Sequence, residues 1–173
     1  MAVVRKTIDF LCVCDRVLLF ALRTICVVCF SLLLLLLTGN VFVRYFPVAA
    51  FYWFDEVVEW MFAWMVFFGA AALWARGEHF RLAWICENLD GKPAGHLVST
   101  VLETISLIFI VIFFYQSLQL TALARDWTPV FNVPRRYLYG CMPVAGAIMV
   151  IYSIRNVMRE TIALVTHKKG ELG

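Results

Sequence analysis

Charged side chains are scarce in this sequence. Asp, Glu, Lys and Arg make up 16% of the 173 residues, whereas 63% are hydrophobic. Soluble domains carry about a quarter charged residues. So little polar material cannot cover the apolar surface of a soluble domain of this size. The composition therefore excludes an ordinary soluble protein and indicates an integral membrane protein.

Histidine is nearly absent. The three histidines, His79, His96 and His167, fall in predicted connections or in the C-terminal tail. A membrane cytochrome needs histidine ligands inside its helices, so no haem site is expected. The sequence also holds no cluster of metal-ligating residues with the spacing of a zinc site. We expect no cofactor, no metal and no enzymatic activity.

Cysteine is present, but without the pattern of a redox enzyme. Cys26 and Cys29 are separated by two residues, yet both lie inside the first predicted span. A membrane thiol oxidoreductase would need paired cysteines on the oxidising side of the membrane. We therefore interpret the cysteines as small apolar packing residues.

Long apolar runs are what the sequence does contain. Four of them cover approximately residues 24–43, 56–75, 97–120 and 139–158. Each reaches the roughly 20 residues that a helix needs to cross a bilayer. The alternating pattern of a membrane β-barrel is missing, and helices satisfy their own backbone groups. We predict an all-α protein in which residues 1–173 form a single membrane domain with four transmembrane helices.

Two further segments have the pattern of helices lying on the membrane surface. In residues 3–20 and just beyond, Asp9, Arg16 and Arg23 recur every seven residues among apolar neighbours and so share one helical face. Residues 80–89 gather apolar side chains on one face in the same way. We predict interfacial helices there. A longer, tilted first span is the alternative for the first segment.

Lys and Arg are distributed unequally between the two sides of the membrane. They predominate at the N-terminus, in the connection after the second span and in the tail. The positive-inside rule then places both termini in the cytoplasm. The net charge of +3 thus reflects orientation in lipid and not nucleic-acid binding. The connection after the third span contains two prolines, and we predict an extended external loop there. Its exposed candidates are Trp127, Asn132, Arg135 and Arg136.

The second span carries two seven-residue patterns. Trp53, Trp60, Phe67 and Trp74 form one aromatic line, which we expect to face lipid or to dock another protein. A second stripe begins with acidic residues and continues with small residues. Small residues let helices approach closely in lipid. Its members are Asp55, Glu59, Ala63, Val66 and Ala70.

Three carboxylates stand at the start of this span. Asp55 and Glu56 fall in the first helical turn, where free N–H groups and the helix dipole favour anions. Glu59 lies one turn deeper and needs a partner, either Arg44 or a basic group on another subunit. We expect Glu59→Ala to weaken assembly more than Glu56→Ala, because a carboxylate buried at an interface loses more than an exposed one.

Charge inside the other spans is limited to a few residues. Glu103 and Arg155 are predicted at similar depth, so an ion pair of Glu103 with Arg155 or with Arg76 is expected. Broken helices and an inverted repeat, which mark a transport site, are missing from the sequence. A transporter that works alone is therefore not supported.

The order of these residues resembles the small membrane subunit of TRAP transporters, the DctQ-like or SiaQ-like family. The resemblance covers nearly the whole chain and includes four spans. The matching elements are Arg44-Tyr45, Trp53, Asp55-Glu56, Trp64, Phe68-Gly69-Ala70, Arg76, His79, Pro134, Tyr137 and Pro143. One departure is Ala83, where members of the family often carry an acid.

The resemblance implies a tripartite importer in the bacterial inner membrane. A periplasmic binding protein captures an organic anion such as a carboxylate, a sugar acid or a sulfonate. A large membrane subunit carries the sodium and substrate sites as an elevator, and the small subunit belongs to the static scaffold. Two alternatives stay open: the small subunit of another tripartite carboxylate importer, and a membrane anchor of a redox complex.

Overall fold

The computed structural model describes residues 2–45, 52–76 and 93–170, and these segments are almost entirely helical. The chain forms α1 (Ala2–Tyr45), α2 (Phe54–Ala75), α4 (Pro93–Leu123), the single turn α5 (Arg136–Tyr139) and α6 (Cys141–Gly170). Four stretches are long and apolar enough to cross a membrane: Val13–Val43, Phe54–Ala75, Val98–Leu123 and Arg136–Arg159. The prediction of a four-span all-α membrane protein is confirmed.

The helix boundaries follow from local sequence. Tyr45 ends α1 two residues before Pro47, whose ring disfavours helix in the residue that precedes it. Pro93 opens α4, where its missing N–H costs nothing. Pro143 is tolerated for the same reason, because it stands in the first turn of α6.

The first helix is one unbroken element of 44 residues, so residues 3–20 do not form a helix separate from the first span. At 1.5 Å per residue it is about 65 Å long, roughly twice the thickness of the hydrocarbon layer. The second predicted interfacial helix, residues 80–89, lies outside the described residues.

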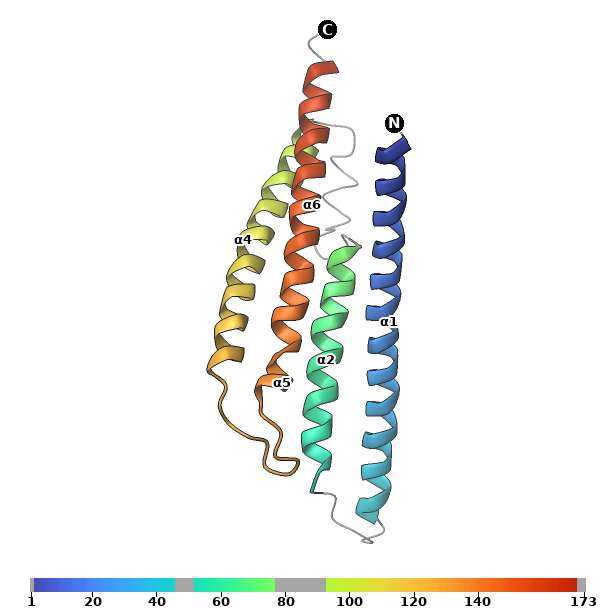
Figure 1. Cartoon of the computed structure of the whole chain (residues 1–173), viewed down its shortest axis with the longest axis vertical. Coiled ribbons are helices and arrows are strands. Elements are labelled where there is room, and N and C mark those ends of the chain that lie inside the picture. Colours follow the sequence, from blue (N-terminus) through green and yellow to red (C-terminus); the bar gives the residue numbers. More distant parts are fainter. Residues whose placement is uncertain (1, 46–51, 77–92, 171–173) are drawn as a thin grey trace.

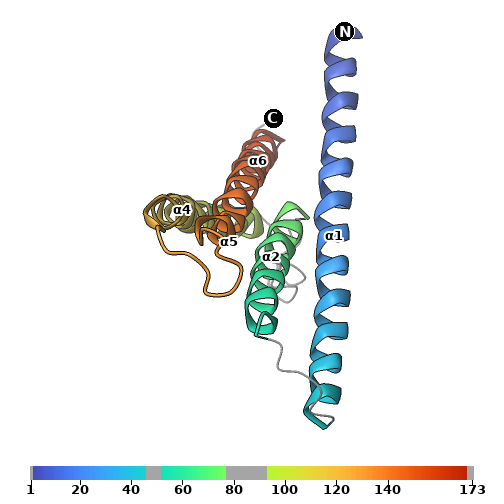
Figure 2. The ribbon, with the colours of Figure 1, turned by 60° about the horizontal axis from the view of Figure 1, so that its bottom comes forward.

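The long helices run side by side along the molecule (Figure 1). Both described ends of the chain lie at one end of the bundle, and the loop between α4 and α5 lies at the other, beside the start of α2. In the second view, α1 stands beside α2 and away from α4 (Figure 2). In this way α2 connects α1 to the α4–α6 pair.

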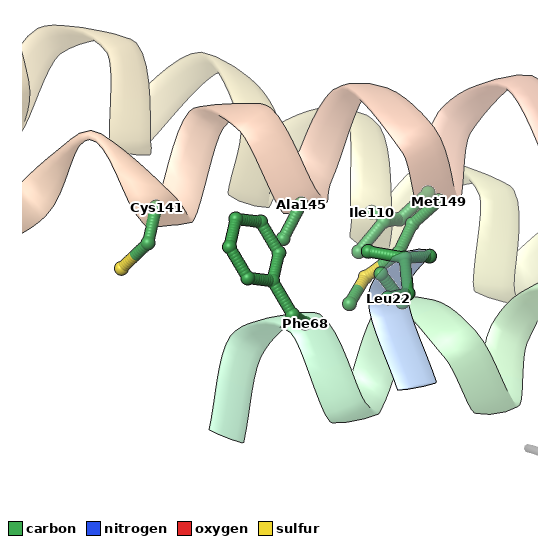
Figure 3. Close-up of a cluster of buried hydrophobic side chains, with 7 residues drawn as sticks. Leu22, Phe68, Ile110, Cys141, Ala145 and Met149 are labelled. Atoms are coloured by element: carbon green, nitrogen blue, oxygen red, sulfur yellow. The ribbon is translucent and has the colours of Figure 1, made fainter. Parts of the chain in front are cut away.

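The core lies where the four long helices meet. Its buried members are Leu22, Phe68, Ala71, Ile110, Cys141, Ala145 and Met149. Figure 3 shows the side chains of Leu22, Ile110 and Met149 lying together, with the Phe68 ring of α2 beside Ala145. A Cβ on Gly146 would approach Phe114 to 3.3 Å and Phe113 to 3.4 Å, so the glycine lets α6 lie close to α4. Such small residues are typical of helix contacts in lipid.

Candidate functional site

The loop that joins α4 to α5 folds back on itself. The Thr128 N–H donates to the Val133 carbonyl over 2.9 Å, and the Arg135 N–H donates to the Asp126 carbonyl over 2.9 Å. Trp127 and Pro134 form an isolated antiparallel bridge. The sequence-based expectation of an extended loop is therefore wrong, because the backbone of one arm satisfies that of the other.

The tip of this loop is a tight turn. Asn132 has a φ of 49°, in the left-handed region that asparagine tolerates better than most residues. Its N–H donates to the Thr128 carbonyl over 3.2 Å, and the Thr128 hydroxyl accepts a hydrogen bond of 3.0 Å from the Val133 N–H. The turn leaves the N–H groups of Val130 and Phe131 free to bind an anion.

Glu56 of α2 supplies that anion. Its Oε2 accepts hydrogen bonds from the Val130 N–H over 3.0 Å and from the Phe131 N–H over 3.4 Å. The Glu56 residue is only 6% exposed. Hydrogen bonds to an ionised carboxylate are stronger than neutral ones. Glu56 therefore ties the loop to the start of α2 across more than 70 residues of sequence.

The other two carboxylates of this region point outward. Asp55 and Glu59 are both exposed. The pKa of Arg135 is raised by a hydrogen bond with Tyr139 and by the negative charge of Glu59 and Asp126. Within this chain Glu56 is the buried carboxylate and Glu59 is exposed, so a partner for Glu59 on another subunit stays a prediction. The side chain of Arg44, the proposed partner of Glu59, is not among those described.

Glu56 is buried and Glu59 is exposed because of the direction in which the aromatic line of α2 faces. Phe67 stacks on Phe113 of α4 with ring centroids 5.9 Å apart, and the Trp74 indole donates to the Ser153 hydroxyl of α6 over 3.2 Å. The expectation that this line faces lipid or a partner protein is therefore wrong for Phe67 and Trp74, which pack within the bundle.

The other two members of the line lie nearer the start of the helix. Trp60 is half-buried, and Trp53 is 37% exposed. Glu56 falls between them at a spacing of three and four residues, on the same inward face. Its place on the aromatic line was the sequence signal that could have identified it as buried.

The predicted loop residues form the outer rim of this end. Trp127, Asn132 and Arg136 are exposed, and Arg135 is half-buried. Trp127 is 62% exposed and Phe131 is 50% exposed. Exposed aromatic side chains rimmed by charge are typical of protein contact surfaces. We call four exposed residues of this turn, Trp127, Val130, Phe131 and Asn132, the loop rim.

A second polar cluster lies near the opposite end of the bundle. Arg155 of α6 pairs with Asp15 of α1 over 3.5 Å and donates to the Ala75 carbonyl at the end of α2 over 3.2 Å. The Tyr152 hydroxyl also donates to Asp15, and the Arg155 guanidinium lies 4.4 Å from the centre of the Tyr152 ring. These four residues, here called the Arg155 cluster, join three helices.

The Arg155 cluster engages the arginine that the sequence suggested as a partner of Glu103. Glu103 lies half-buried in α4, and Arg155 pairs with Asp15 instead. Arg76, the other predicted partner of Glu103, is exposed. Asp15 belongs to residues 3–20, whose pattern predicted an interfacial helix outside the first span, so the sequence offered no pairing of Asp15 with α6. His79 lies outside the described residues.

Both polar sites hold the chain together. Two buried serines are satisfied within α4 itself: Ser106 donates to the Leu102 carbonyl and Ser117 to the Phe114 carbonyl, over 2.8 Å each. Cys26 contacts Met65 and Gly69 of α2, as a packing residue would. Among the described residues, no group of three His, Cys, Asp or Glu side chains could hold a metal ion. Glu56 and the Arg155 cluster thus join separate helices and the loop.

Comparison with known proteins agrees with this architecture. A search of curated proteins found no match. Residues 33–162 match the family model described as the DctQ component of tripartite ATP-independent periplasmic transporters. The match covers well over half of the chain and includes all of α2, α4 and α5. This multi-pass membrane protein belongs to the DctQ family, the small component of TRAP transporters.

Proposed function

We propose that this chain is the scaffold subunit of a sodium-coupled TRAP importer for an organic anion in the bacterial inner membrane. Family membership carries this proposal. The polar contacts support it, because those of Glu56 and Arg155 hold the chain's own helices and loop together, and the hydroxyls of Ser106 and Ser117 are satisfied within their own helix. The large membrane subunit would carry the sodium and substrate sites, and this chain would brace it.

We propose that the loop rim contributes to the surface that the periplasmic binding protein meets. The rim presents aromatic side chains on a turn whose shape is set by Asn132 and Glu56. Asp55, Glu59 and Arg136 add exposed charge of both signs near it. Charged groups around an apolar centre steer association and fix its register. The outward apolar side chains of α1 and α4 remain for lipid and for the large subunit.

Transport by purified components tests the scaffold role. We expect anion uptake into proteoliposomes, driven by an inward sodium gradient, to need this chain, the large subunit and the binding protein together. The chain alone should bind no organic acid. Full uptake by the other two components without this chain would contradict the proposal, and uptake without a sodium gradient would contradict the coupling.

The orientation in the membrane has its own test. We expect the loop rim to face the periplasm and both termini to face the cytoplasm, because Lys and Arg predominate at the end that holds the termini. With exposed Cys14 replaced by serine, cysteine at exposed Asn132 should react with an impermeant reagent added to whole cells. Cysteine at exposed Thr161 of α6 should react only after lysis. The reverse labelling pattern would show that the orientation in the membrane is the opposite of the one proposed.

A further inference from the structure

Arg23 of α1 is a charged residue at membrane depth on the outside of the bundle. It lies within the candidate span Val13–Val43 and is exposed. Among the described residues it has no ion-pair or hydrogen-bond partner. An arginine within a membrane span is costly unless something pairs with it, and it is a functional-site hypothesis by default.

The contacts between α1 and α2 give the depth of Arg23. Cys26 lies beside Gly69, with its Sγ 3.7 Å from the position of a Cβ there. Asp15 lies near Ala75, because Arg155 contacts both. Arg23 is therefore level with the last turns of α2. Since α2 has 22 residues, or about 33 Å, its ends mark the edges of a hydrocarbon layer of about 30 Å. Arg23 lies just inside one edge.

A second arginine lies nearer the membrane surface on the same face. Arg16 precedes Arg23 by seven residues, or about 10 Å along the axis, and is also exposed. Helical side chains lean toward the helix N-terminus, so Arg23 leans toward Arg16 and the surface. The nearest described acid, Asp15, is engaged by Tyr152 and Arg155. Two cations thus stand one above the other at the depth of lipid phosphates.

The same face continues below Arg23 as an apolar strip. Val27, Phe30 and Leu34 recur at helical spacing there and are 57% to 59% exposed, and Phe20, 71% exposed, lies on the same face between the two arginines. The two arginines at the edge of the hydrocarbon layer match the charged headgroup of an anionic phospholipid, and the apolar strip beneath them matches its acyl chains. We propose that Arg16 and Arg23 bind the headgroup of an anionic phospholipid whose acyl chains lie along this strip of α1.

Lipid retention by the purified full-length chain tests this site. Native mass spectrometry after incubation with phosphatidylglycerol vesicles, with phosphatidylcholine as the neutral reference, measures the bound lipid. Each basic residue near an anionic membrane surface strengthens binding to anionic lipid, so Arg23→Gln should weaken phosphatidylglycerol binding about fivefold. The double variant, which also carries Arg16→Gln, should weaken it about 25-fold. Arg23→Lys should retain most of the binding, and phosphatidylcholine binding should stay unchanged.

Arg125→Gln is the matched control, because Arg125 is an exposed arginine at the other end of the bundle. It should leave phosphatidylglycerol binding at the wild-type level, and circular dichroism should show equal helix content in all variants. Wild-type phosphatidylglycerol binding by the double variant would overturn the proposal. So would equal affinity for the two lipids. Loss of co-purification with the large subunit at unchanged lipid binding would assign Arg23 to a protein carboxylate instead.

Discussion

Replacement of Glu56 by alanine should release the loop between α4 and α5 from α2. The carboxylate is buried and accepts two backbone hydrogen bonds from the turn, those of Val130 and Phe131. Without it, both N–H groups lose their acceptor, and a bond to a charged group is worth more than a neutral one. We expect amide hydrogen exchange at these two residues to accelerate about tenfold or more, measured by mass spectrometry on loop peptides.

Two variants make this test specific. Glu59→Ala removes an exposed carboxylate one turn away and should leave exchange in the loop unchanged. Glu56→Gln keeps a carbonyl acceptor but loses the charge, so its effect should be intermediate. Unchanged protection of Val130 and Phe131 in Glu56→Ala would mean that the turn holds its shape by its own hydrogen bonds alone.

If the loop rim meets the binding protein, release of the loop should also reduce transport. We expect Glu56→Ala to lower uptake more than Glu59→Ala, which is the reverse of the ranking that the sequence alone suggested. Co-purification with the large subunit measures assembly separately from uptake. Equal uptake by the two variants would show that the loop rim is not part of the surface that the binding protein meets.

The Arg155 cluster should be the second large determinant of stability. Arg155→Gln removes the pair with Asp15 and weakens the contact with the Ala75 carbonyl, so three helices lose a shared contact. Polar contacts between helices in lipid are worth about 1–2 kcal/mol in model peptides, and half of the Arg155 side chain is exposed. We expect the free energy of unfolding of the purified chain to fall by about 1–2 kcal/mol.

A double-mutant cycle with Asp15→Asn isolates the pair itself. Unfolding in mixed micelles with increasing sodium dodecyl sulfate gives the free energy of unfolding for each variant. The combined variant should lose less than the sum of the two single losses, because each removes the same interaction. Arg76→Gln is the control, since Arg76 is exposed beside the same carbonyl end of α2. A coupling free energy of zero would mean that the Asp15–Arg155 pair does not stabilise the fold.

The contrast between Glu56 and Glu59 shows where sequence reasoning stops. Depth along a helix can be counted from the sequence, and by that measure Glu59 is the deeper residue. The inward direction depends on which neighbours surround the helix: α2 lies against α1, α5 and α6, and its Phe67 stacks on Phe113 of α4. The face of Trp60, Phe67 and Trp74 points inward, and Glu56 belongs to it. Periodicity identified two stripes on α2 but not which of them was buried.

The sequence by itself determined the class of this protein. Apolar runs of membrane length, scarce charge and the order of residues from Arg44 to His79 were enough for four spans and for the DctQ family, because span length and residue order are local properties. The tertiary structure decided the pairings: Glu56 with the turn at Val130, and Arg155 with Asp15. Each joins residues more than 70 positions apart, and in lipid such partners are selected by close helix packing that no local pattern encodes.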